Sequence, residues 1–178
     1  MKFVVIIAGV ICCLAMATGN SVSSVPQLQA GTLCENTEKV VFSCTTKPAM
    51  KIVSLCSSKE LTKERGYLQY RFGLPGKVEL EFPKAHEQAQ SAFKYSHYFR
   101  AQFDQTEISF TQNGYVYAIF DDYNGEDLPY SREEKKPARY EQGVRITVLS
   151  NGKEVTLSCR GKAQAQYEDL GGVFPEPE

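Results

Sequence analysis

Apolar and polar residues alternate along much of the chain from Val40 onward. Residues 68–72 and 78–82 are apolar at every second position, and the turn-forming sequence Gly-Leu-Pro-Gly at 73–76 separates them. A period of two is typical of half-buried strands, so these segments are predicted to form a hairpin. The register that places all their apolar side chains on one face pairs Phe72 with Val78, Tyr70 with Leu80 and Leu68 with Phe82.

Two Asn-Gly dipeptides indicate further hairpins. Asn-Gly readily adopts the two positive φ angles of a type I′ turn, and apolar residues alternate on both sides of Asn113-Gly114 and of Asn151-Gly152. The first turn predicts that Phe110 pairs with Tyr117 and Ile108 with Ile119. The second predicts the pairs Val148 with Val155, Ile146 with Leu157 and Val144 with Cys159.

The remaining patterns complete an all-β fold. Short strands are predicted at 40–44 and 51–56, and a Ser-x-x-Glu sequence followed by Gly66 predicts one short helix near Ser58–Arg65. The fold class is therefore an antiparallel meander of eight or nine strands, closed as a barrel or folded as a sandwich. A longer strand is predicted at 93–103, with one face formed by Phe93, Tyr95, His97, Phe99, Ala101 and Phe103.

The segments outside these strands set the domain boundaries. Residues 18–33 are small and polar and are expected to form a mobile lead-in, and 34–163 are expected to form a single β domain. Within it, the charged stretch 121–143 has no apolar period and is predicted to be a long polar loop. The tail at 164–178 is predicted to be irregular, although Tyr167, Leu170 and Phe174 could dock on the sheet.

The N-terminus has the organisation of a secretory signal peptide. Lys2 precedes an apolar run from Phe3 to Leu14, and Ala15-Met16-Ala17 matches an Ala-x-Ala cleavage site, so residues 1–17 are expected to be removed. The run is too short to span a bilayer, and no other stretch approaches the length of a membrane helix. We therefore expect a periplasmic or secreted protein without a transmembrane anchor in the mature chain.

Four cysteines remain after cleavage near Ala17, an even number that favours two disulfides in an exported chain. They are Cys34, Cys44, Cys56 and Cys159. Three connectivities are possible. If the first and last strands are neighbours, Cys34–Cys159 with Cys44–Cys56 is favoured. A metal site is not expected, because the spacing lacks Cys-x-x-Cys and the two histidines lie far from the cysteines in sequence.

Charge and motifs argue against several functional classes. The 178 residues contain 20 basic and 21 acidic side chains, a balance that does not favour a nucleic-acid partner. There is no Gly-x-Ser-x-Gly, and neither His86 nor His97 has a partner motif. Glu79 and Glu81 lie two residues apart on one strand face, a spacing that a glycosidase could use but that a solvated face explains better. No enzymatic activity and no cofactor are predicted.

A recognition surface is the remaining prediction. Tyrosine and arginine are frequent anchors of protein interfaces, and the face of 67–71 opposite the apolar one is polar and aromatic. The candidate binding residues are Tyr67, Gln69, Arg71, Glu79, Tyr123, Tyr130 and Arg132.

Part of the chain also resembles a known group of proteins. The segments 53–58 (VSLCSS), 66–73 (GYLQYRFG) and 77–80 (KVEL) are similar to sequences in a family of exported, β-rich periplasmic proteins of Gram-negative bacteria. The resemblance implies a bacterial origin and a periplasmic location. It implies no activity, because the function of that family is unknown.

Three functions follow as hypotheses. The first is a non-enzymatic protein that binds another macromolecule, such as an envelope protein or a hydrolase that it inhibits. The second is a glycan-directed hydrolase that uses Glu79 with Glu81 or Asp121. The third is a β-barrel that binds a small ligand in an interior site lined by Phe93, Tyr95 and Phe99.

Overall fold

A computed structural model describes residues 31–86, 89–126, 138–167 and 170–174, which are almost entirely β structure. The predicted signal peptide and most of the predicted lead-in lie outside these ranges. A single helical turn, α1 (Ala89–Ala92), precedes the second half of the strands. The strands are β1 (Glu38–Lys47), β2 (Ile52–Ser58), β3 (Leu68–Leu74), β4 (Lys77–Phe82), β5 (Lys94–Arg100), β6 (Phe103–Gln112), β7 (Tyr115–Asn124), β8 (Arg139–Val148), β9 (Glu154–Cys159) and β10 (Gln164–Ala165).

The strands form one antiparallel sheet in the order β4-β3-β2-β1-β9-β8-β7-β6-β5, and the short β10 pairs with β1. Each half of the sheet is a meander of sequential neighbours. The two halves join where the end of β1 pairs with the end of β9, at Thr46 opposite Cys159. The predicted antiparallel, all-β architecture is thus confirmed.

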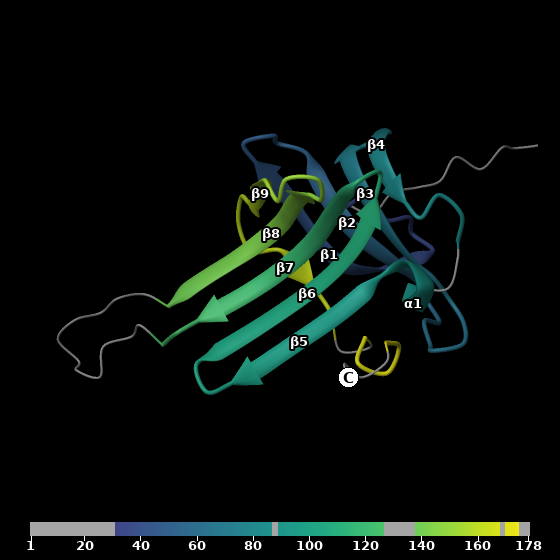
Figure 1. Cartoon of the computed structure of the whole chain (residues 1–178). Coiled ribbons are helices and arrows are strands. Elements are labelled where there is room, and N and C mark those ends of the chain that lie inside the picture. Colours follow the sequence, from purple (N-terminus) through teal and green to yellow (C-terminus); the bar gives the residue numbers. More distant parts are fainter. Residues whose placement is uncertain (1–30, 87–88, 127–137, 168–169, 175–178) are drawn as a thin grey trace, which may run out of the picture.

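The sheet bends over itself, so that β1–β4 lie behind β6–β8 in Figure 1. The core fills the space between the two halves. Phe110 of β6 stacks on Phe82 of β4 with ring centroids 4.3 Å apart and contacts Tyr70 of β3 at 5.0 Å. Burial of these rings is the main force that holds the halves together, because the stabilisation of a fold is roughly proportional to the apolar surface area that is removed from water.

The sheet does not close into a barrel. Among the described residues, β4 and β5 stand at the two ends of the strand order and do not pair with each other. The prediction of a closed barrel or a sandwich is therefore not confirmed: one continuous sheet curves around the core instead. Bulges contribute to the curvature, because an extra residue bends the strand that carries it, and both β1 and β4 have one.

The turn chemistry fixed one hairpin register correctly. Asn113 and Gly114 both have positive φ, 50° and 80°, and Phe110 pairs with Tyr117 and Ile108 with Ile119 as predicted. The predicted aromatic strand 93–103 is also a strand, β5, but it ends at Arg100. Gln102, with a φ of 61°, turns the chain so that Phe103 begins β6 opposite Arg100.

The other two predicted registers are wrong by two residues. In the β3–β4 hairpin Tyr70 lies opposite Phe82 and Phe72 opposite Leu80, because Glu79 forms a bulge on β4 and the strands pair up to Leu74 and Lys77. In the β8–β9 hairpin Ile146 lies opposite Val155 and Val144 opposite Leu157, because the connection is wider than a two-residue turn. A shift of two keeps a side chain on its face, so Leu80, Phe82 and Ile146 pack against the core as predicted. Val78 and Val155, predicted on the same apolar faces, are instead largely exposed.

The predicted helix near Ser58–Arg65 is wrong. Residues 59–66 form bends, and the Ser58 hydroxyl accepts a hydrogen bond from the Tyr67 N–H at 3.2 Å instead of capping a helix. The segment is largely exposed and offers no continuous apolar side to bury. A helix that short is unstable in water without such packing.

All four predicted cysteines form disulfides, but the favoured pairing is wrong. The bonds are Cys34–Cys56 and Cys44–Cys159. The first and last long strands are indeed neighbours, yet the cysteine of β1 that reaches β9 is Cys44. Cys34 precedes β1 and lies instead beside β2, where Cys56 pairs with Val40.

The boundaries of the predicted domain are wider than expected. Thr32 and Leu33, placed in the mobile lead-in, are buried, and the Leu33 N–H donates to the Ser54 hydroxyl at 2.9 Å. In the tail, Gln164–Ala165 forms β10, and the side chains of Leu170 and Phe174 are buried in the core. The ordered protein therefore includes residues on both sides of 34–163.

Candidate functional site

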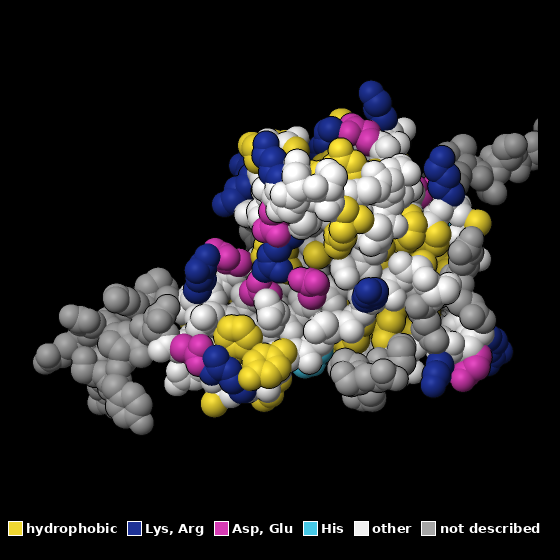
Figure 2. Space-filling view, viewed as in Figure 1, with side chains coloured by type: hydrophobic (Ala, Val, Ile, Leu, Met, Phe, Trp, Pro, Cys, Tyr) yellow, Lys and Arg dark blue, Asp and Glu magenta, His cyan; other side chains and the backbone are white. Residues whose placement is uncertain are grey.

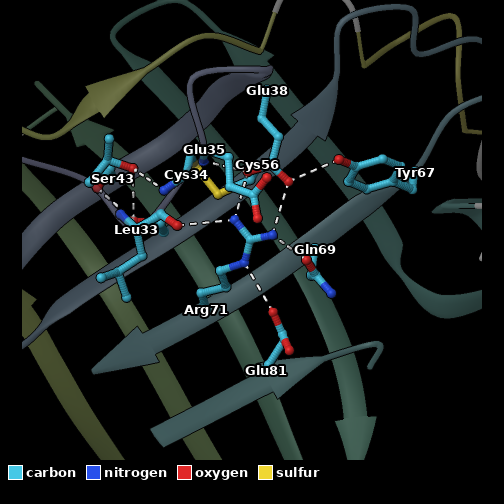
Figure 3. A network of polar contacts seen from close by, with 12 residues as sticks. Leu33, Cys34, Glu35, Glu38, Ser43, Cys56, Tyr67, Gln69, Arg71 and Glu81 are labelled. Atoms are coloured by element: carbon cyan, nitrogen blue, oxygen red, sulfur yellow. Dashed lines mark hydrogen bonds and ion pairs between the residues drawn. A yellow bond between two sulfur atoms is a disulfide. The ribbon is translucent and has the colours of Figure 1, made fainter. Parts of the chain in front are cut away.

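Gln69 and Arg71 form the centre of a buried polar network (Figure 3). The Arg71 guanidinium donates to both carboxylate oxygens of Glu38, at 2.6 and 3.0 Å, and from Nε to Glu81 at 3.1 Å. Its remaining N–H groups bind the Leu33 carbonyl at 3.0 Å and the Gln69 side-chain oxygen at 2.5 Å. Arg71 is only 5 % exposed and Glu38 4 %.

This burial corrects the predicted recognition face. Gln69 and Arg71 were expected on an open side of the sheet, but the segment that leads into β1, held by the Cys34–Cys56 disulfide, covers them. Tyr67 lies at the rim and donates its hydroxyl to Glu38 at 3.0 Å. Burial, reinforced by that hydrogen bond, raises the pKa of Tyr67 to about 12, so the hydroxyl stays protonated. The network stabilises structure and offers no accessible guanidinium to a partner.

The other predicted residues do not join this cluster. Glu79 is exposed on β4 and pairs with Lys51 at 2.5 Å. Tyr130 and Arg132 lie outside the described residues. Tyr123 lies near the end of β7, at the opposite end of the sheet from Glu79, so the predicted binding residues do not form one surface.

The stretch 121–143 is only partly the predicted loop. Strand β7 continues to Asn124 and β8 begins at Arg139, so strands account for both ends of the stretch. These extensions pair with each other and with β6, as in the row Asp104–Tyr123–Tyr140. The paired ends of β5–β8 project beyond the other half of the sheet (Figure 1) and are here called the far end.

A polar hollow of about 330 Å³ lies at the far end, and we call it the distal hollow. Its lining residues come from three neighbouring strands: Phe103 and Gln105 of β6, Asp122, Tyr123 and Asn124 of β7, and Arg139, Glu141 and Arg145 of β8. Tyr123 is the one predicted binding residue that lines it.

Charges of opposite sign alternate around the distal hollow. Arg145 pairs with Asp122 and, at 3.2 Å, with Glu107, and its guanidinium lies over the Phe120 ring at 3.9 Å. Such stacking adds a cation–π attraction to the ion pairs and fixes the position of the guanidinium. The second Asp122 oxygen, Oδ1, is buried and has no hydrogen-bond partner among the described residues. That oxygen is an unused acceptor next to the hollow.

Exposed aromatic rings lie on both faces of the far end. Tyr98 contacts the Phe103 ring beside the distal hollow, whereas the strand pairing places Phe99 and Tyr140 on the opposite face. Phe99 is 72 % exposed, Tyr98 53 % and Tyr140 48 %. The Arg100 guanidinium covers the Phe103 ring at 4.9 Å and pairs with Glu126 at 2.7 Å. Figure 2 shows apolar and basic side chains side by side over the β5–β6 end of the sheet, with mixed charges above them.

The sequence pattern alone did not indicate Arg145 or Asp122. Each occupies a polar position in an alternating strand, where a charged residue is ordinary. Their proximity depends on the pairing of β7 with β8, and the charged stretch between them was interpreted as a loop. The usable signal was the alternation of Val144, Arg145 and Ile146, which continues the β8 strand.

One cluster contains residue types that often bind metal ions, but its ligand atoms are not available to a metal. Ligand atoms of Cys34, Glu38 and Cys56 lie within 4.8 Å of one another. The two sulfurs are joined in a disulfide and the Arg71 guanidinium binds the carboxylate, so neither thiolates nor a free carboxylate are available to a cation.

No helix within the described ranges is long and apolar enough to cross a membrane. Comparison of the chain with known family models, with curated proteins and with solved structures finds no match. The far end and its hollow therefore have to be interpreted from their own chemistry.

Proposed function

We propose that this chain is an exported, periplasmic, non-enzymatic protein of Gram-negative bacteria that binds another macromolecule through the far end of its sheet. The partner class is an envelope protein or a hydrolase that the chain inhibits. The observation that carries the proposal is the group of exposed rings at the far end: Tyr98 lies beside a hollow lined with arginines, and Phe99 and Tyr140 lie on the opposite face of the same strands.

The composition of this surface supports a protein partner. Aromatic and arginine side chains are enriched at the centres of protein interfaces. The exposed rings of the far end do not fill the core of this protein, so packing of the fold does not explain them. The four paired strands hold the rings on a rigid support, which lowers the entropic cost of binding. The two disulfides are compatible with an exported protein.

The hydrolase alternative has less support. Lys51 binds Glu79 and Arg71 binds Glu81, so each carboxylate is already occupied by a cation. Asp121 accepts a hydrogen bond from the Gln142 amide at 2.8 Å. None of these three acids lines the distal hollow.

The small-ligand barrel also has less support. Phe93 is buried against the rings of Phe82 and Phe110, whereas Phe99 is open to solvent. The two rings therefore do not line a shared interior space, and the sheet is not closed around one.

Photo-crosslinking in a periplasmic extract tests the proposal. A crosslinking amino acid at position 99 should capture a defined partner, whereas the same residue at position 149 should not, although Leu149 is also exposed, at 59 %. The captured protein is then titrated with purified chain. The double variant Tyr98→Ala/Phe99→Ala should weaken binding by about tenfold or more, as expected for interface anchors.

The matched control is Leu149→Ala/Val155→Ala, which removes two exposed apolar side chains from the opposite part of the sheet. It should bind normally. Equal losses in both variants, or capture at position 149 as efficient as at 99, would contradict a specific role of the far end. Inhibition of a captured cell-wall hydrolase would identify the inhibitor class.

A further inference from the structure

We infer that a second hollow, which shares only Glu141 with the lining of the distal hollow, binds a compact group that carries at least two negative charges, such as a phosphate or diphosphate. This inference goes beyond the proposed function and does not depend on it. The hollow has a volume of about 480 Å³ and lies where β9 ends beside β8 and the end of β1. We call it the basic hollow.

The basic hollow gathers cations that have no acidic partner within the described part of the chain. Its lining includes Lys47 at the end of β1 and Arg160 and Lys162 just after β9. None of the three side chains forms an ion pair with another described residue. The single lining carboxylate, Glu141, is bound by Arg139 at 3.0 Å.

This local excess of positive charge is not a property of the whole chain. The sequence has a formal net charge of −1, so a random surface region of this size should be close to neutral. Unpaired cations around a concavity produce a positive potential that attracts anions. A monovalent anion would satisfy one cation and leave the others, so a multivalent group fits better.

The frame of the basic hollow is rigid. The Cys44–Cys159 disulfide ties β1 to β9 at its wall, and Lys47 lies opposite Ser158 in the strand pairing. The Arg160 N–H donates to the Thr45 carbonyl at 2.8 Å, and the Ala163 N–H donates to the Gln142 side chain at 2.8 Å. The backbone that carries the cations is therefore fixed before a ligand arrives.

The hydrogen-bond donors of the basic hollow suit a phosphate. Ser158 adds a hydroxyl to the lining, and an arginine can donate two parallel hydrogen bonds to phosphate oxygens while lysines add point charges. Phosphate concentrates two charges on one small group, which matches several cations around one space better than a monocarboxylate does.

Calorimetric titration of the purified chain with inorganic pyrophosphate tests the inference. Binding should weaken about tenfold or more in the triple variant Lys47→Ala/Arg160→Ala/Lys162→Ala, and it should weaken steeply with added salt. The charge-matched control Lys77→Ala/Lys94→Ala/Lys153→Ala removes three basic side chains elsewhere and should bind within about twofold of the parent. Circular dichroism confirms that both variants are folded.

Two further arms distinguish the source of the phosphate. Binding to vesicles of anionic phospholipid, but not of phosphatidylcholine, that depends on the same three residues would assign a lipid headgroup. Pyrophosphate binding without vesicle binding would assign a soluble phosphate. The inference is overturned if pyrophosphate does not bind at millimolar concentration, or if the control variant loses as much affinity as the triple variant.

Discussion

Arg71 illustrates how a protein can bury a charged side chain almost completely. A guanidinium has five N–H donors, and the structure supplies an acceptor to each of them: Leu33, two oxygens of Glu38, Gln69 and Glu81. The cost of removing the charge from water is thereby offset by hydrogen bonds and by the opposite charge of Glu38. The same bonds connect the segment before β1 to β3 and β4, so one side chain links three parts of the chain.

This arrangement predicts that removing one partner is costly. Glu38→Ala leaves the Arg71 charge buried without its main counter-ion, and we expect the free energy of unfolding to fall by about 3–5 kcal/mol in urea titrations. Glu79→Ala is the control, because it breaks the more exposed pair with Lys51 and should cost less than about 1 kcal/mol. If both variants lowered the free energy of unfolding by the same small amount, the buried network would contribute little to stability. In the double variant Glu38→Met/Arg71→Met, the loss should be smaller than the sum of the single losses.

At the scale of elements, the joint between β8 and β9 depends on Gly143. A Cβ atom built at this position would lie 2.2 Å from the Leu157 carbonyl oxygen and 3.0 Å from the Ser158 Cα. The two strands therefore approach at a distance that only glycine permits. The approach brings β9 to the end of β1, where the Cys44–Cys159 disulfide connects the two halves of the sheet.

Gly143→Ala is accordingly expected to destabilise the protein. The backbone of β9 would have to move away, and overpacking of this kind costs about 1–3 kcal/mol in the free energy of unfolding. Gly171→Ala provides the comparison, since nothing lies within 4 Å of its added Cβ and the change should stay within about 0.5 kcal/mol. Thermal and urea unfolding measure both. A neutral Gly143→Ala would mean that the strands can separate at no cost.

At the scale of the whole molecule, the aromatic core makes the two meanders one structure. Phe110 contacts rings of both halves, Tyr70 and Phe82 on one side and Phe93 and Tyr117 on the other. Tyr70 also contacts Tyr117, Phe82 contacts Phe93, and the β1–β9 pairing and the Cys44–Cys159 disulfide connect the halves directly. The packing of Phe110 is therefore expected to carry much of the cooperativity between them.

Phe110→Ala is predicted to lower the free energy of unfolding by about 3–5 kcal/mol, the range for deleting a buried phenylalanine. Far-ultraviolet circular dichroism and tyrosine fluorescence should still follow one transition, as expected for a single domain. Phe99→Ala, at a position 72 % exposed, is the matched control and should leave stability nearly unchanged. Two separate transitions in the parent chain would instead show that the meanders fold independently.

The local sequence determined which residues share a face and where one tight turn lies. Leu68 and Tyr70 are buried side by side as their alternation predicted, and Asn113-Gly114 fixed the β6–β7 register, because side-chain period and turn geometry are properties of neighbouring residues. The same reasoning named Tyr123 as a candidate binding residue of the predicted 121–143 loop, but it did not place the residue on β7 or locate the hollow that it lines.

Tertiary structure decided what covers each face and which distant residues meet. Alternation could not show that the segment before β1 would cover Arg71, nor that Cys34 would bond to Cys56, because both depend on contacts between residues far apart in the chain. The distal and basic hollows arise in the same way, from pairing of β7 with β8 and of β1 with β9. Periodicity acts over neighbouring residues, whereas burial, disulfide partners and concave surfaces are set by how the whole sheet curves in space.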